Sequence, residues 1–474
     1  MSREIVKQLD PIFKPRSIAI IGASKNPNKW GGRALTRVLK GNYRGGIYPI
    51  NPNNSEIMGF KAYGDVNEVN DEIDLAVFAV PAAHMPKVMK SCIKKGIKGG
   101  VILSADFAET GEKGRSLEQE TVRIAKSGGL RFVGPNGMGI WTSAVGLNLA
   151  LESVPSSGSL AFVSQSGTFG GNLAQIAQIK GYGLSKFISI GNQADISAAE
   201  YLQYLAQDND TRVIAFYIEG FKDGRRFFEV AKEVVKIKPV LVYKGGTSTP
   251  GARATISHTA SIAGSDEIFD AMCRQAGIIR TSEMRHLFIM AEALIGLPLP
   301  RGNRVAVIGS GGQGVVTVDS CASLGLDAPE LDEEARSKMK EVLPAHAPVP
   351  SNPVDFAGGS RTAVDEAIIA EMLVKLDYID GIISNVPITF TPSLNIGDNM
   401  KTWIDGTNIM AGIPERYGKP VITQRFMGFE NETICSILKK AGIPIYDGPE
   451  DSARAMYGLV RYAQIKNRWN NSGG

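Results

Sequence analysis

Long hydrophobic runs and a strong net charge are both missing from this chain of 474 residues. No apolar run reaches the roughly 18–20 residues that cross a membrane. The N-terminal sequence "MSREIVKQLD" lacks the apolar stretch of a signal peptide, so we expect a cytoplasmic protein without a membrane partner. The formal net charge is only +4, and nucleic-acid binding requires clustered basic residues. We therefore expect no nucleic-acid partner.

Cysteine and histidine are also rare, with four of each in the whole chain. The widely spaced cysteines form no CxxC pair, and they are Cys92, Cys273, Cys321 and Cys435. This pattern is typical of reduced, structural cysteines, although a catalytic thiol stays open as an alternative. No GxxxxGK[ST] sequence occurs, so the chain has no Walker A nucleotide loop.

Short apolar runs that end in small or polar residues recur along the chain, separated by segments with a helical pattern. They fall into three sets: 17–22, 46–51, 75–80, 99–104 and 131–136; then 160–167, 186–192, 213–220 and 239–246; then 304–312, 381–388, 420–426 and 443–448. Nearly unbroken apolar runs indicate strands covered on both faces, and hence parallel sheets. Alternation with helices predicts three consecutive doubly wound α/β domains.

Turn-forming residues are densest at "ESVPSSGS" (152–159) and "GLPLPRGN" (296–303). Clusters of turn-forming residues are typical of domain boundaries. We therefore predict domains at residues 1–150, 151–298 and 299–474. Ligands of open α/β sheets bind at the carboxyl ends of the strands, so the residues after each strand are the candidates for a site.

Small residues follow three strands of the first set. They are Gly22, Ala23 and Ser24 in "IIGAS", Val80 and Pro81 in "VPAAH", and Ser104 and Ala105 in "SADFAETG". Small residues at a strand-to-helix turn let backbone N–H groups approach a phosphate, which the helix dipole also favours. Several such turns around one crevice suit an extended, nucleotide-like ligand. A tight turn without a ligand is the alternative reading of each turn taken alone.

The stretch "VSQSGTFGGN" (163–172) combines hydroxyl groups with a predicted helix start at Ser166, Gly167 and Thr168. Hydroxyls and exposed amides converge there, where an oxyanion could bind; simple helix capping is the alternative. A GxGxxG sequence occurs at Gly309–Gly314. It allows a nicotinamide dinucleotide site, but a lone GxGxxG is weak and a structural turn explains it better.

His258 lies in "ATISHTASIAG", within a run of small residues that begins at Gly245. A histidine there could be a solvated loop residue. Metal binding is disfavoured because no second His or Cys stands at ligand spacing, and no metal site is expected. It could also be a nucleophile, since imidazole forms covalent phosphoryl intermediates. Glu219, at the end of another strand of the same unit, could orient the ring and stabilise the charged adduct.

The motifs "GASKNPNKWGG", "SADFAETG", "GPNGMG", "SQSGTFG", "GNQADIS", "YIEG", "SHTASIAG" and "NPVDF" occur in this order. Together they resemble the nucleoside-diphosphate-forming acyl-CoA synthetases, relatives of succinyl-CoA synthetase. The resemblance covers nearly the whole chain. Gly137 stands where the family often has Cys, and Asp106 stands where "SAGF" is usual.

The resemblance implies a Rossmann-like CoA-binding domain followed by two flavodoxin-like ligase domains. It implies that His258 is a phosphohistidine steadied by Glu219, with Ser166–Thr168 holding the phosphate. It also implies that CoA, a substrate, contacts the turns after the first strands. The acyl group or substrate acid would bind at Asn136, Gly137, Gly191 and Asn192.

The resemblance also implies a partner. No segment resembles an ATP-grasp domain, so this chain is similar to a separate α subunit whose β subunit binds Mg²⁺ with ADP/ATP or GDP/GTP, in an α2β2 heterotetramer. The expected reaction interconverts acyl-CoA, nucleoside diphosphate and phosphate with a small carboxylic acid, CoA and nucleoside triphosphate, through acyl phosphate and phosphohistidine. Two alternatives are a non-catalytic CoA-binding regulatory module and an NAD-dependent dehydrogenase.

Overall fold

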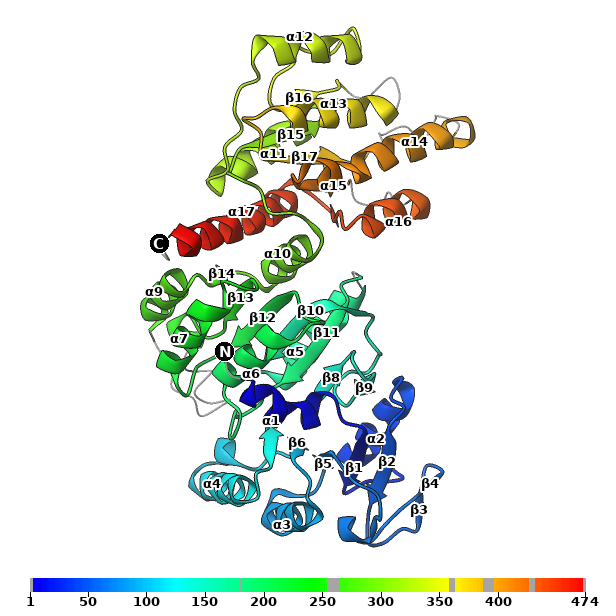
Figure 1. Cartoon of the computed structure of the whole chain (residues 1–474), viewed down its shortest axis with the longest axis vertical. Coiled ribbons are helices and arrows are strands. Elements are labelled where there is room, and N and C mark those ends of the chain that lie inside the picture. The colour runs from blue at the N-terminus through cyan, green and yellow to red at the C-terminus, as the bar shows by residue number, and fades with distance from the viewer. Residues whose placement is uncertain are drawn as a thin grey trace. The chain divides into compact units, whose positions relative to one another are not determined.

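In a computed structural model, the chain forms two compact units, Met1–Ser282 and Glu283–Gly474. The structure describes residues 3–179, 181–251, 253, 265–357, 363–386, 396–425 and 431–471. Within these ranges, three large sheets alternate with helices (Figure 1). Two of the sheets lie in the first unit and one in the second.

The first sheet has five strands in the order β2-β1-β5-β6-β7. Its strands are β1 (Ser17–Ile21), β2 (Gly46–Ile50), β5 (Leu75–Phe78), β6 (Gly99–Ile102) and β7 (Arg131–Val133), beside a small hairpin of β3 (Glu56–Ile57) and β4 (Phe60–Lys61). The accompanying helices are α1 (Glu4–Phe13), α2 (Trp30–Lys40), α3 (Met85–Lys95) and α4 (Glu112–Ser127). All neighbouring strands of the five run parallel. Because the chain goes from β1 out to edge strand β2 and returns to β5, the direction of winding reverses between β1 and β5, where open α/β sheets bind ligands.

The second sheet has seven strands in the order β14-β13-β12-β10-β11-β8-β9. They are β8 (Ile140–Thr142), β9 (Leu147–Asn148), β10 (Ser157–Ser164), β11 (Leu184–Ser189), β12 (Val213–Ile218), β13 (Val240–Lys244) and β14 (Ile279–Thr281). Helices α5 (Gly167–Ile179), α6 (Ala198–Gln207), α7 (Gly224–Val234) and α9 (Asp266–Ala276) accompany them. Strand β8 pairs antiparallel with β11 and β9 antiparallel with β8, while the remaining pairs are parallel.

Helix α1 and strand β7 connect the two sheets of the first unit. The ring of Phe13 in α1 stacks on Tyr204 of α6, with centroids 4.8 Å apart, and the Tyr204 hydroxyl donates to Asp10 at 3.0 Å. Arg131 in β7 donates to the carboxylate of Asp195 at 2.8 Å. Contacts of this kind hold the two sheets of the first unit against each other.

The second unit contains a parallel five-stranded sheet in the order β16-β15-β17-β18-β19. The strands are β15 (Val305–Gly309), β16 (Val354–Asp355), β17 (Gly381–Asn385), β18 (Val421–Gln424) and β19 (Ile445–Tyr446). The helices are α10 (Met284–Gly296), α11 (Gly312–Ser323), α12 (Glu333–Val342), α13 (Ala363–Lys375), α14 (Ile396–Ala411), α15 (Ile413–Tyr417), α16 (Glu432–Lys440) and α17 (Pro449–Asn471). Helix α17 packs against α10, α11, β17 and β18.

The predicted α/β class with parallel sheets is confirmed, and each of the predicted apolar runs overlaps a strand. Sequence reasoning missed the hairpin of β3 and β4 and the short strands β8, β9, β14 and β16. With β8 and β9 it missed the antiparallel edge of the second sheet. The limits 1–150, 151–298 and 299–474 stay a prediction. Among the described residues, no helix is both long and apolar enough to cross a membrane.

Candidate functional site

The first turn of the first sheet is built around two glycines. Gly22 follows β1 with φ of +88°, and a Cβ atom there would lie 2.6 Å from the carbonyl oxygen of Ala79. A Cβ atom on Gly31 in α2 would lie 2.0 Å from the carbonyl oxygen of Gly22. Only glycine at these positions lets the helix start and the end of β5 approach the turn. Ala23 is buried, and the Ser24 hydroxyl accepts a hydrogen bond from the Asn26 amide at 3.1 Å.

The other residues predicted to contact CoA follow β5 and β6. The hydroxyl of buried Ser104 donates to the carbonyl oxygen of Val80, so these two turns are joined. Pro81 and Ala105 are exposed beside them. The amide of Asn136, after β7, donates to the carbonyl oxygen of Ser104 at 2.9 Å. The structure therefore brings the predicted turns to the same edge of the first sheet.

The four residues predicted to contact the acyl group also lie together, on two loops that meet backbone to backbone. Gly191 has φ of +50°, and a Cβ atom there would lie 2.0 Å from the carbonyl oxygen of Pro135. The Asn192 amide donates to that same oxygen at 3.0 Å, and the side chain of Asn136 donates to that of Asn192 at 3.3 Å. A Cβ atom on Gly137 would lie 2.7 Å from a backbone oxygen, that of Ser189. Glycine at 137 thus allows this close packing, which a cysteine would displace.

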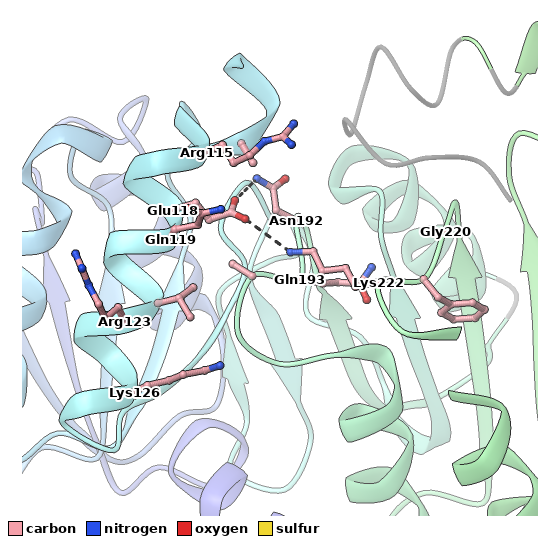
Figure 2. Close-up of a pocket in the computed structure, with 13 residues that line it drawn as sticks. Arg115, Glu118, Gln119, Arg123, Lys126, Asn192, Gln193, Gly220 and Lys222 are labelled. Carbon is pink, nitrogen blue, oxygen red and sulfur yellow. Dashed lines mark hydrogen bonds and ion pairs between the residues drawn. The ribbon is translucent and has the colours of Figure 1, made fainter. Parts of the chain in front are cut away.

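Asn192 continues the network away from the acyl loops. Its Nδ2 donates to Glu109 at 2.6 Å and to Glu118 at 2.9 Å. Figure 2 shows Glu118 of α4 facing both Asn192 and Lys222, with Lys222 3.7 Å from the carboxylate of Glu118. Sequence reasoning missed this network because it depends on contacts between distant segments.

The predicted phosphate turn lies next to the acyl loops. Ser166 is buried, Thr168 is exposed, and Gly167 begins α5. A Cβ atom on Gly167 would lie 2.8 Å from the side chain of Met138, which follows the acyl residue Gly137. The first amides of a helix have no partner within the helix, so the start of α5 can donate to an oxyanion.

Glu219 is joined to this turn through Gln165. Glu219 follows β12 and is only 5% exposed. The side-chain oxygen of Gln165 accepts from the amides of Glu219 at 2.9 Å and Gly220 at 3.2 Å. The Tyr217 hydroxyl donates to Glu219 at 3.3 Å. Burial is the main cause that raises the pKa of Tyr217, and the negative charge of Glu219 raises it further. Gln165 was not predicted, although a polar residue at the end of a buried strand was a usable signal.

His258 lies outside the described residues, but residues on both sides of its segment are described. After β13, the amide of Gly245 donates to Ile218 at 2.8 Å, so the chain leaves the sheet beside Glu219. On the other side, Ser265 caps α9 by accepting from Ile268. Buried Lys244, at the end of β13, lies 3.8 Å from Asp266 at the start of α9. The two described residues Lys244 and Asp266, which stand before and after 245–264 in the sequence, therefore lie close together.

The GxGxxG sequence and the cysteines, the other candidates from the sequence, have structural roles in the fold. In the second unit, Gly309 and Gly314 come within close contact across a tight turn, and Asp355 accepts a hydrogen bond from the Gly311 amide at 3.0 Å. Burial raises the pKa of the Cys92, Cys273 and Cys321 thiols to about 12, which disfavours the reactive thiolate. Among the described residues, no group of three or more His, Cys, Asp or Glu residues could hold a metal ion.

Comparison with protein families matches both sheets of the first unit. Residues 16–142 match the CoA binding domain, and residues 157–294 match the succinyl-CoA ligase like flavodoxin domain. The predicted order, a CoA-binding domain followed by a flavodoxin-like domain, is thereby confirmed. The fold and the family matches define a class of proteins that combine a CoA binding domain with a succinyl-CoA ligase like flavodoxin domain.

Relatives that match nearly the whole of this chain identify its family within this class. The α subunit of acetate–CoA ligase [ADP-forming] II from Pyrococcus furiosus is 40% identical over 459 residues, which cover 96% of this chain and 98% of the relative. Acetate–CoA ligase [ADP-forming] II from Archaeoglobus fulgidus is 34% identical, over 97% of this chain but 68% of the relative. The chain belongs to the α subunits of the nucleoside-diphosphate-forming acyl-CoA synthetases.

A solved structure agrees with this assignment over the whole chain. The acetyl-coenzyme A synthetase 1 of Ca. Korarchaeum cryptofilum, in complex with phosphate and ADP, is 32% identical with a TM-score of 0.87. The match covers 98% of this chain and 99% of that one. Neither the regulatory-module alternative nor the dehydrogenase alternative is favoured by these relatives.

Proposed function

We propose that this chain performs the thioester and phosphohistidine steps of a reversible acyl-CoA synthetase. In the first step, an oxygen of inorganic phosphate attacks the thioester carbon of an acyl-CoA. The carbon–sulfur bond breaks, the proton of hydrogen phosphate passes to the sulfur so that CoA leaves as the thiol, and acyl phosphate forms. The turns at residues 22–24, 80–81 and 104–105 would bind CoA, and the paired loops at Asn136–Gly137 and Gly191–Asn192 would hold the acyl group.

In the second step, a ring nitrogen of His258 attacks the phosphorus of the acyl phosphate. The nitrogen–phosphorus bond forms, the bond from phosphorus to the acyl oxygen breaks, and the carboxylate leaves. Ser166, Gly167 and Thr168 would hold the phosphoryl oxygens at the start of α5, and Glu219 would accept a hydrogen bond from the other ring nitrogen. This proposal depends chiefly on one observation, that Gln165 joins the Glu219 loop directly to the predicted phosphate turn.

The third step requires a partner. We propose that an ATP-grasp β subunit binds Mg²⁺ with ADP or GDP and receives the phosphoryl group from His258, in an α2β2 assembly. Phosphoryl transfer to a nucleotide needs Mg²⁺ and cationic groups placed around the phosphates. Two findings support a separate partner: the P. furiosus relative is named a subunit α, and the A. fulgidus relative is longer than this chain.

Labelling of His258 tests the phosphoryl-carrier role. We expect the native complex to incorporate labelled phosphate from the γ-position of a nucleoside triphosphate in the presence of Mg²⁺. The label should be lost in acid and stable in alkali, as a phosphorus–nitrogen bond is, and absent from His258→Ala. Ser257 and Thr259 are the competing acceptors, so a label that survives acid, or persists in His258→Ala, would overturn the assignment.

A further inference from the structure

A pocket of about 740 Å³ lies beside the proposed active site, on the side of α4. One wall is the face of α4 that carries Arg115, Glu118 and Lys126, and the opposite wall consists of residues 192–194 and 220–222. The volume is within the range of roughly 300–1,000 Å³ that small-molecule sites occupy. Asn192 of the acyl loops lies at its edge, and the proposed reaction gives no role to the other residues that line it.

The pocket is rich in positive charge. Figure 2 shows Arg115 and Lys126 extending from α4 toward the opposite wall, and Lys222 extending from that wall toward α4. Among the described residues that line it, Glu118 carries the single carboxylate. This side chain is 7% exposed, accepts a hydrogen bond from Asn192 and forms an ion pair with Lys222. Neither Arg115 nor Lys126 has an ion-pair partner among the described residues. The pocket therefore has an excess of cationic groups that no carboxylate of its own balances.

The spacing of these groups limits what can bind. Arg115 and Lys126 are separated by 11 positions on one helix, so their Cα atoms lie about 16 Å apart at about 1.5 Å per residue. A single phosphate or a small carboxylate is too short to reach both side chains together with Lys222. An elongated ligand with several anionic groups can reach them, and a guanidinium fork matches phosphate oxygens well. Val122, Ala194 and Phe221 add apolar lining for an uncharged part of the ligand.

We propose that this pocket binds a polyphosphate chain of the kind carried by a nucleoside diphosphate or triphosphate. The site is separate from the nucleotide site of the proposed β subunit, and it requires neither that subunit nor catalysis. Arg115 and Lys126 bind the two ends of the ligand, and Lys222 turns from Glu118 to a phosphate between them.

Titration calorimetry on the full chain without a partner tests this site. ADP is titrated in one series and inorganic tripolyphosphate in another, and we expect both to bind. In R115Q/K126Q, affinity for both should fall by about tenfold or more, since one charge-assisted hydrogen bond contributes roughly that factor. Both side chains are exposed, so the fold should persist, which an unchanged melting temperature would verify.

The matched control is K90Q/K113Q. It removes the same charge from exposed lysines on α3 and α4 that do not line the pocket, and we expect its affinities to equal those of the parent chain. Both titrations are repeated with saturating CoA, because the ADP part of CoA could otherwise be mimicked at the CoA turns. Under that condition, tighter binding of ADP than of tripolyphosphate would show that the nucleoside also contacts the pocket, and equal binding would show recognition of the phosphate chain alone. Absence of binding by both probes, or equal weakening in the control, would overturn the proposal. Because the readout is binding by the lone chain, the result does not depend on the phosphohistidine mechanism.

Discussion

Replacing Glu219 with Gln tests the electrostatic part of the proposed mechanism. The buried carboxylate is proposed to face a histidine that becomes positively charged when phosphorylated, and the amide of Gln lacks the charge that stabilises this adduct. Loss of one preorganised electrostatic group commonly lowers turnover by about 10²–10³, or about 3–4 kcal/mol. We therefore expect a fall of that size in the turnover of acyl-CoA formation by the complex.

The fold should survive this change. The Glu219 loop is attached to Gln165 by backbone amides at 2.9 and 3.2 Å, and the substitution leaves these amides in place. The Tyr217 hydroxyl can donate to the side-chain oxygen of Gln as it does to the carboxylate. The melting temperature should therefore stay close to that of the parent protein.

Steady-state turnover and the yield of acid-labile phosphoprotein are measured together in this experiment. Glu229→Gln, on the exposed surface of α7, is the matched control and should leave both quantities unchanged. Tyr217→Phe removes only the hydrogen bond to Glu219 and should have a smaller effect than Glu219→Gln. Turnover of Glu219→Gln within about threefold of the parent, well short of the loss expected for such a group, would remove Glu219 from the reaction.

Further predictions concern CoA, the partner and pH. CoA should raise the melting temperature of the lone chain, since a ligand of the folded state stabilises it; Ser24→Trp should abolish that rise, and an unchanged rise would place CoA elsewhere. The lone chain should form no thioester from acid, CoA and nucleoside triphosphate until an ATP-grasp β subunit is added. Full activity without that subunit would refute the assignment of nucleotide binding to a partner. Burial raises the pKa of Glu366 from 4.5 to about 8, so the folded chain retains a proton that the unfolded chain loses, and stability falls as pH rises through this interval. Glu366→Gln should therefore raise the melting temperature at pH 9 relative to the parent more than at pH 4, and an equal change at both would show that this proton is not linked to folding.

The parallel strands were predictable because they are buried along their whole length. "SIAII" at 17–21 and "LAVF" at 75–78 are buried at every position, so they appear in sequence as unbroken apolar runs. Strands β8 and β9 contain only three and two residues, too few to show a period. Strand β8 joins the second sheet by pairing with β11, and β9 joins it by pairing with β8; a local pattern contains neither pairing.

The candidate site was predictable where its residues follow strands. Asn136 follows β7 of the first sheet and Asn192 follows β11 of the second, and the carboxyl ends of strands are where open α/β sheets bind ligands. That these two ends meet depends on how the two sheets pack, which a local pattern does not contain. The contacts between Gln165 and the Glu219 loop, and between Glu118 and Lys222, were not predictable, because each joins segments far apart in sequence. The assignment of His258 still depends on sequence and resemblance alone.

The antiparallel edge formed by β8 and β9 limits how this protein can be divided into fragments. A cut between residues 150 and 151 would leave the edge of β11 without its partner, and an unpaired strand edge invites association with other chains. The same cut would separate Asn136 from Asn192, which hydrogen-bond across the two loops. A CoA-binding fragment of this protein could thus retain the turn at Gly22 yet lack a completed acyl pocket. A chimaeric protein made from two such chains should therefore take the first two sheets together from one parent.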